Sequence, residues 1–239
     1  MTIRITDASP RTAARIAGIG YLIIFGLAIF ANFFVREGLV DPDSAAATFA
    51  NIADSEFLFR IGMVSFLGVF IIDVVIAWAL YVLFKSVSRE LSLLTAWFRL
   101  VYTLFLGVAL IFFFVVLDLV SGAGYLAAFE PGQLDAHVAL MLNAFNYAWL
   151  IGLAGFGIHL MLLGYLMLAS HTAPRVLGIL LTVAGAAYVL DTIANVLLSN
   201  YVDYETVFLL IVAVPAVVAE LGFAVWLLTS GGVEQRVFQ

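Results

Sequence analysis

Long apolar segments dominate the sequence, and they limit the folds open to this chain more than any other feature. The 239 residues are 65% hydrophobic and only 11% charged, with a mean hydropathy of +1.16. Soluble domains carry about a quarter charged residues, and an apolar run of about 20 residues is long enough to cross a bilayer as a helix. The sequence therefore predicts an integral membrane protein, with nearly all of its length in apolar spans and short connections.

Six apolar segments qualify as membrane spans. They cover approximately residues 14–35, 58–84, 91–119, 146–169, 175–198 and 206–228. The first follows several arginines, but it is too long for a signal peptide and lacks a small-x-small cleavage site. We therefore expect an all-α fold: a bundle of six transmembrane helices that forms a single transmembrane domain over residues 1–239, with a short additional helix on the outer surface.

Composition also excludes some classes of function. The chain contains no cysteine, which excludes disulfides and metal sites built on thiolates. Its net charge is −6 and its arginines are scattered, so nothing resembles the basic surface that binds nucleic acid. The lipid bilayer is the expected partner, and nucleic acid is not.

The distribution of Lys and Arg predicts the orientation, because cytoplasmic connections are enriched in these residues. The tails and two of the connections hold Arg4, Arg11, Arg15, Lys85, Arg89, Arg175 and Arg236, whereas the other side holds Arg36 and Arg60. We therefore expect a multi-pass protein of the cell membrane with both termini in the cytoplasm and acidic connections outside.

Two of the outer connections have helical patterns. In DPDSAAATFANI, Asp41 is a candidate N-cap and Pro42 occupies the favoured first helical position. A second pattern, in PGQLDAHVALMLNAF, predicts an interfacial helix that leads into the fourth span. Its apolar side chains are Leu134, Val138, Leu142 and Phe145.

Ionisable residues within the spans form a predicted polar layer, since such groups are costly in hydrocarbon and face the bundle interior. They are Asp73, Arg99, His159, Asp191 and Glu220. Counting from the cytoplasmic ends of the spans at about 1.5 Å per residue places four of them roughly 14–18 Å deep, and Asp191 at about 24 Å. By depth, the expected partner of Arg99 is Asp73 or Glu220.

The charges of this layer do not balance, because three acids face one fixed positive charge. We expect that at least one acid is protonated, shares a proton with His159, or binds a cation. The other interpretation of His159 is a neutral ring bonded to a backbone carbonyl or a hydroxyl. Gly152 and Gly155 align with His159, and such small residues let another backbone approach.

Five segments carry a resemblance to a known family. They are LFRIG (58–62) with Asp73, AWFRL (96–100), GIHLMLLGYLM (157–167), PRVLGILLTVAGAAYVLD (174–191) and ELGFAVWLL (220–228). With these residues the chain resembles the bacterial and archaeal membrane-protein family catalogued as domain of unknown function 4386. The resemblance covers most of the chain and implies a multi-span membrane fold. It implies no catalytic residue.

The function we expect is binding or transport of a small molecule or ion, with proton coupling as one version, since buried acids and histidines serve proton-linked carriers. Tyr188, Asp191 and Asn195 share one helix face. The candidate ligand- or proton-binding residues are Asp73, Arg99, His159, Tyr188, Asp191, Asn195 and Glu220. Six spans make a small carrier, so a homo-oligomer is a further expectation.

Two alternatives remain. In the first, the protein is structural or regulatory, and its buried polar groups only hold helices together. In the second, it is an intramembrane enzyme, which is less favoured because the chain has no H-E-x-x-H motif, no second central histidine and no thiolate. The sequence therefore predicts no metal site and identifies neither a cofactor nor a catalytic residue.

Overall fold

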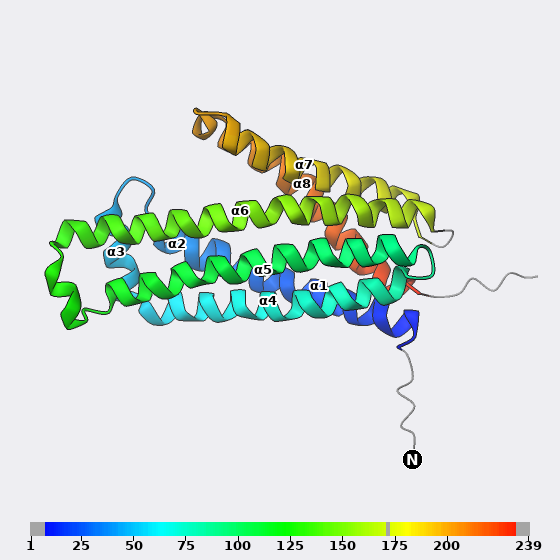
Figure 1. Ribbon diagram of the computed structural model, residues 1–239, viewed down its shortest axis with the longest axis horizontal. Helices are drawn as coiled ribbons and strands as arrows, with labels where there is room; N and C mark the ends of the chain where they lie inside the picture. The colour runs from blue at the N-terminus through cyan, green and yellow to red at the C-terminus, as the bar shows by residue number, and fades with distance from the viewer. Residues whose placement is uncertain (1–7, 171–172, 233–239) are drawn as a thin grey trace, which may run out of the picture. The chain divides into compact units, whose positions relative to one another are not determined.

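In the part of the chain that the structure describes, six helices are long and apolar enough to cross a membrane. The computed structural model describes residues 8–170 and 173–232, and within them these helices cover Pro10–Leu39, Glu56–Phe84, Arg89–Val120, Gly132–Ala169, Arg175–Leu197 and Tyr201–Thr229. The same residues contain no strand (Figure 1). The prediction of an all-α, six-span membrane fold is thereby confirmed. Arg4 and Arg236, which contributed to the predicted orientation, lie outside the described residues.

The first and last spans are composite. The first consists of α1 (Pro10–Ile29), the π-helix η1 (Phe30–Arg36) and α2 (Glu37–Leu39). The last joins the 3-10 helix η3 (Tyr201–Tyr204) to α8 (Glu205–Thr229). The other four spans are α4 (Glu56–Phe84), α5 (Arg89–Val120), α6 (Pro131–Ala169) and α7 (Arg175–Leu197). Most of these helices begin several residues before the predicted apolar segment, because the polar residues that precede the segment are also helical.

The predicted short helix after the first span is present as α3 (Ala45–Asp54), but it begins later than expected. Pro42 lies in a turn rather than at the first helical position. Ser44 is the N-cap, and its hydroxyl accepts a hydrogen bond from the Ala47 amide at 3.1 Å. Asp41 instead accepts a bond from the Asp43 amide. The predicted cap at Asp41 was therefore wrong: serine is also a favoured N-cap residue, and Ser44 starts the helix.

The predicted interfacial helix before the fourth span is also present, and it is continuous with that span. Together they form α6, a single helix of 39 residues that begins at Pro131. A short 3-10 helix, η2 (Gly124–Ala128), lies in the connection from α5. The side chain of Gln133 accepts a hydrogen bond from the Glu130 amide at 3.1 Å, which pairs one of the free donors at the start of a helix.

The chain divides into two compact units. The first contains the described residues among 1–22, 73–101 and 153–239, and the second contains 23–72 and 102–152. The second unit has an aromatic core, in which Phe113 stacks on Phe145 with ring centroids 3.9 Å apart. Trp149 packs edge-on against Phe66. Every ionisable residue of the predicted polar layer falls in the first unit.

Within the first unit, α6 and α7 pack through glycines at close backbone contacts. A Cβ atom added at Gly157 would lie 2.6 Å from the Gly185 carbonyl oxygen, and one at Gly164 would lie 2.5 Å from that of Gly178. Small residues allow such approach between membrane helices. In the second unit, Gly152 meets α5: a Cβ atom added there would lie 3.4 Å from the Tyr102 carbonyl oxygen, so a second backbone approaches this glycine as predicted.

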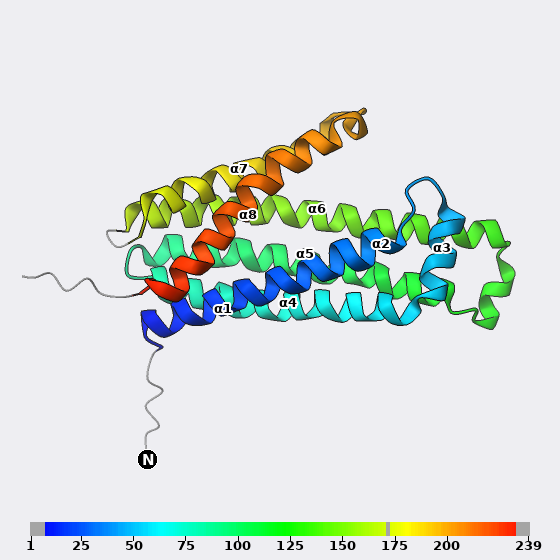
Figure 2. The ribbon, with the colours of Figure 1, turned by 180° about the vertical axis from the view of Figure 1, so that it is seen from behind.

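Arg11 joins the start of α1 to the end of α8. Its guanidinium donates hydrogen bonds to the carbonyl oxygens of Gly231, Leu228 and Thr229 at 2.8, 2.9 and 3.0 Å, and to that of Leu227 at 3.4 Å. Figure 2 shows the blue start of α1 beside the red end of α8. The last carbonyls of a helix lack intrahelical partners and carry partial negative charge, so a cation caps α8 here.

Candidate functional site

Arg99 of α5 is the centre of the polar layer. The residue is only 1% exposed, as is Asp73 of α4. Arg99 donates two hydrogen bonds to the same oxygen, Asp73 Oδ1: one from Nε at 2.9 Å and one from its NH2 group at 2.5 Å. A buried guanidinium requires such a partner. The prediction that Arg99 pairs with Asp73 or Glu220 is confirmed, and the partner is Asp73.

Two further helices contribute acceptors to Arg99. Its NH1 group donates to the Tyr21 hydroxyl of α1 at 2.7 Å and lies 3.2 Å from His159 Nε2 of α6. The other ring nitrogen, Nδ1, lies 2.8 Å from the Thr95 carbonyl oxygen. Because arginine can only donate and a carbonyl can only accept, Nε2 must be unprotonated and Nδ1 must carry the hydrogen. His159 is therefore a neutral ring of defined tautomer.

The structure distinguishes between the two interpretations of His159. In one of them His159 shares a proton with an acid of the layer, but both of its ring nitrogens contact other groups. The other interpretation, a neutral histidine bonded to a backbone carbonyl, is the one that the structure shows. Within this network His159 orients Arg99 and links α6 to α5.

Aromatic rings enclose the guanidinium. The Arg99 Cζ atom lies 4.7 Å from the centroid of the Tyr21 ring and 5.5 Å from that of Phe156. Phe156 also stacks on His159, and Phe223 packs edge-on against Tyr21. Cation–π contacts of this kind are stronger where water is excluded, so the rings and the acceptors together stabilise one buried charge.

Two acidic groups of the site keep unused acceptors. Oδ2 of Asp73 is buried and has no hydrogen-bond partner in the described part of the chain. Glu220 of α8 is half-buried and makes no hydrogen bond or ion pair with any described residue, although its charge interacts with Arg99 and Asp73. Asp73 and Arg99 neutralise each other. Glu220 is the acid in excess.

The remaining predicted site residues lie away from Arg99 or reach it indirectly. Asp191 of α7 accepts a 2.5 Å hydrogen bond from the Tyr201 hydroxyl, beside which Asn195 also lies. Tyr188 packs edge-on against Phe156 with ring centroids 5.5 Å apart, so it contacts the wall of the central site. Asp191 and Asn195 therefore lie beside Tyr201, outside the contacts described above for Arg99.

Tyr21 and Phe156 were not among the predicted site residues. Tyr21 had a usable sequence signal, since it places a hydroxyl inside the first apolar span, and the structure buries it to 4% exposure. Phe156 precedes His159 by three residues and so shares its helix face. Among residues 8–170 and 173–232, no three His, Asp or Glu side chains lie in positions that could hold a metal ion.

Comparison with known proteins identifies the family. Residues 16–231 match the family described as domain of unknown function (DUF4386). The chain belongs to the DUF4386 family. It is also 31% identical over 173 residues to an uncharacterized protein of Archaeoglobus fulgidus, a match that covers 70% of this chain and 83% of that protein. No solved structure matches the chain. All residues of the Arg99 site in this DUF4386 protein fall within the matched region.

Proposed function

We propose that this DUF4386 protein binds or transports a small molecule or ion that carries positive charge or hydrogen-bond donors, and that the Arg99 site receives it. One observation carries the proposal: Asp73 Oδ2 is buried without a donor among the described residues. A buried acceptor left without a donor costs about 1–3 kcal/mol, and more when it is charged. A ligand that donates to this oxygen removes that cost.

Glu220 supports the same proposal. It adds a second carboxylate to a site whose positive charge is already matched by Asp73. Ionisable groups inside membranes mark pathways for ions, protons and substrates. A cationic ligand, or a proton, on Glu220 restores neutrality, which connects ligand binding to proton movement in the proton-linked version of this function.

The test uses thermal unfolding of the purified protein in nanodiscs, with sodium, potassium, ammonium, methylammonium, guanidinium and choline as probes. We expect at least one cation to raise the melting temperature of the wild type, and the shift to be lost in Glu220→Gln. Glu205→Gln is the matched control, because Glu205 lies in the same helix and is exposed. The proposal fails if no cation stabilises the wild type, or if Glu220→Gln responds as the wild type does.

A structural role is the second candidate, and the contacts of Arg99 favour it specifically. One guanidinium binds side chains from α1, α4 and α6, so it joins four helices without any ligand. Interhelical hydrogen bonds in membranes are worth about 0.6 kcal/mol each on average. In this role Glu220→Gln leaves both stability and cation response unchanged.

We further propose that the protein lies in the cell membrane with both termini in the cytoplasm. The excess of Lys and Arg in the tails and in two connections supports this orientation. Cysteine labelling of intact cells tests it. A thiol placed at Ser44 should react with an impermeant reagent and one placed at Ser88 should not; the reverse pattern means that the topology is inverted.

A further inference from the structure

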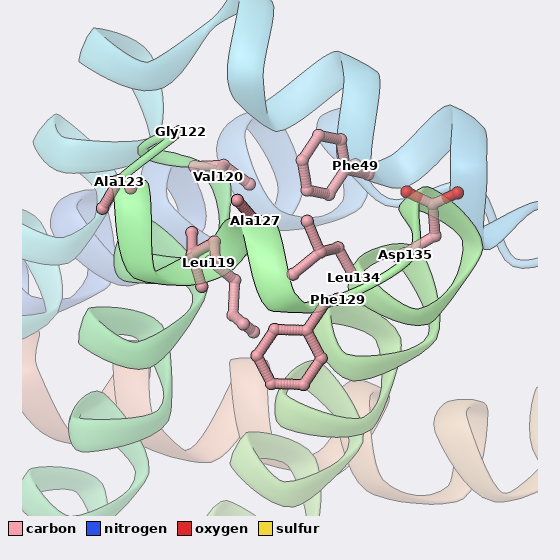
Figure 3. A pocket seen from close by; sticks show the side chains of 11 residues that line it. Phe49, Leu119, Val120, Gly122, Ala123, Ala127, Phe129, Leu134 and Asp135 are labelled. Carbon is pink, nitrogen blue, oxygen red and sulfur yellow. The ribbon is translucent and has the colours of Figure 1, made fainter.

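A second candidate binding site lies in the unit that does not contain Arg99. It is a pocket of about 500 Å³ at the end of α5, between α3 and the start of α6. That volume is in the range of pockets that hold small molecules. In Figure 3 the side chains of Phe49, Leu119 and Leu134 gather in the pocket, and the Asp135 carboxylate lies at its edge. Leu126 and Phe129 also line it.

The polar side chain of this pocket is a carboxylate without a partner. Asp135 is half-buried, and it makes no hydrogen bond or ion pair with any residue among 8–170 and 173–232. Every other residue that lines the pocket is apolar or glycine. A ligand therefore meets one negative charge at the edge of an otherwise apolar surface.

The surrounding charge has the same sign. The second unit holds eight acidic residues and two basic ones, Arg36 and Arg60. Both arginines already contact neighbouring acids: Arg36 lies 3.5 Å from Glu37, and Arg60 lies 2.5 Å from Glu56. From residue 100 to residue 174 the sequence contains no Lys or Arg. The potential at the pocket is therefore negative, which attracts cations.

From this geometry we propose that the pocket binds a lipophilic cation: an amine or quaternary ammonium whose apolar group enters between α3, α5 and α6 while its charge lies against Asp135. The apolar group gains from leaving water, about 25 cal/mol for each Å² buried. The charge gains from the carboxylate, and the aromatic rings of Phe49 and Phe129, which also line the pocket, offer cation–π contacts. The site is independent of the Arg99 site and of any function proposed for it.

Equilibrium dialysis of the full chain in zwitterionic nanodiscs tests the proposal, with empty nanodiscs subtracted. The probes are 4-phenylbutyltrimethylammonium and its uncharged isostere, in which carbon replaces the nitrogen. We expect saturable binding of the cation, and binding of the isostere about five- to tenfold weaker, the range expected for a partly buried ion pair. Asp135→Asn should weaken binding of the cation by the same factor and leave binding of the isostere unchanged.

Two variants complete the design. Asp118→Asn removes an exposed acid at the end of α5 that does not line the pocket, and it should bind the cation as the wild type does. Leu134→Ala removes apolar contact area from the pocket and should weaken binding of both probes. The proposal is overturned if the cation binds no more to the protein than to empty nanodiscs, if cation and isostere bind equally, or if Asp135→Asn and Asp118→Asn have equal effects.

Discussion

Replacing Arg99 by leucine tests the centre of this structure most directly. The substitution removes two hydrogen bonds to Asp73, the bond to Tyr21 and the contact with His159. It also leaves the Asp73 carboxylate, 1% exposed, without its counter-charge. Breaking a buried ion pair from one side costs about 3–5 kcal/mol, because the remaining charge stays desolvated. We expect a loss of that size in the free energy of unfolding for Arg99→Leu.

A second substitution tells which acid is the partner. Replacing both members of a buried pair with apolar residues is often nearly neutral, so Asp73→Leu added to Arg99→Leu should recover about 2 kcal/mol or more. Adding Glu220→Leu should recover much less, because no bond joins Glu220 to Arg99 among the contacts described. The recovery measures the interaction energy between Arg99 and its partner, which a single substitution cannot separate from other losses of stability.

The assay is reversible unfolding in mixed micelles of a mild detergent and dodecyl sulfate, followed by far-UV circular dichroism. Arg60→Leu is the matched control, because it breaks an ion pair with Glu56 that is exposed on both sides. Exposed pairs contribute about 0–1 kcal/mol. The reasoning is refuted if Arg99→Leu costs no more than Arg60→Leu, or if Glu220→Leu rescues it as well as Asp73→Leu does.

Three further predictions concern the contacts around this centre. In ¹⁵N NMR spectra at neutral pH, His159 should show a protonated Nδ1 and an unprotonated Nε2; the opposite tautomer would contradict its bonds to Thr95 and to the guanidinium. Gly164→Ala should destabilise the protein by about 1–3 kcal/mol in the micelle assay, because the added Cβ atom would overlap α7. Gly26 has open space around it, so the control Gly26→Ala should be neutral or stabilising. Equal effects of the two substitutions would argue against close packing of α6 on α7. Arg11→Met should cost about 1–2 kcal/mol by uncapping α8, and the exposed Arg15→Met should cost less than half as much; a cost no larger than that of Arg15→Met would show that the cap is unimportant.

Much of the fold could be predicted from the sequence, because the length of an apolar segment and the rise per residue of a helix hardly depend on how the helices pack. Counting residues placed Asp73, Arg99 and His159 at one depth, and the structure brings those three together. Depth alone left the partner of Arg99 open, since it does not give the rotation of each helix about its axis. The choice of Asp73 over Glu220 is a property of packing.

Other features depend on neighbours that the sequence does not name. Helical periodicity showed that glycines line α6, but it did not show that Gly157 and Gly164 would meet α7. The π-helix over Phe30–Arg36 has no signature in composition. Tyr21 could not be singled out from the sequence, because an uncharged hydroxyl costs much less free energy in a membrane span than a charge does and so does not demand a polar partner.

The contact between Arg11 and the last turn of α8 has a consequence for biogenesis. A chain emerges from the ribosome with its amino-terminal part first, so α1 is made before any of the carbonyl groups that Arg11 binds. Those acceptors, on Leu227 to Gly231, lie 216 to 220 residues further along the chain. Arg11 can therefore cap α8 only after the whole intervening chain has been made, and synthesis that stops before Leu227 leaves α1 without this contact.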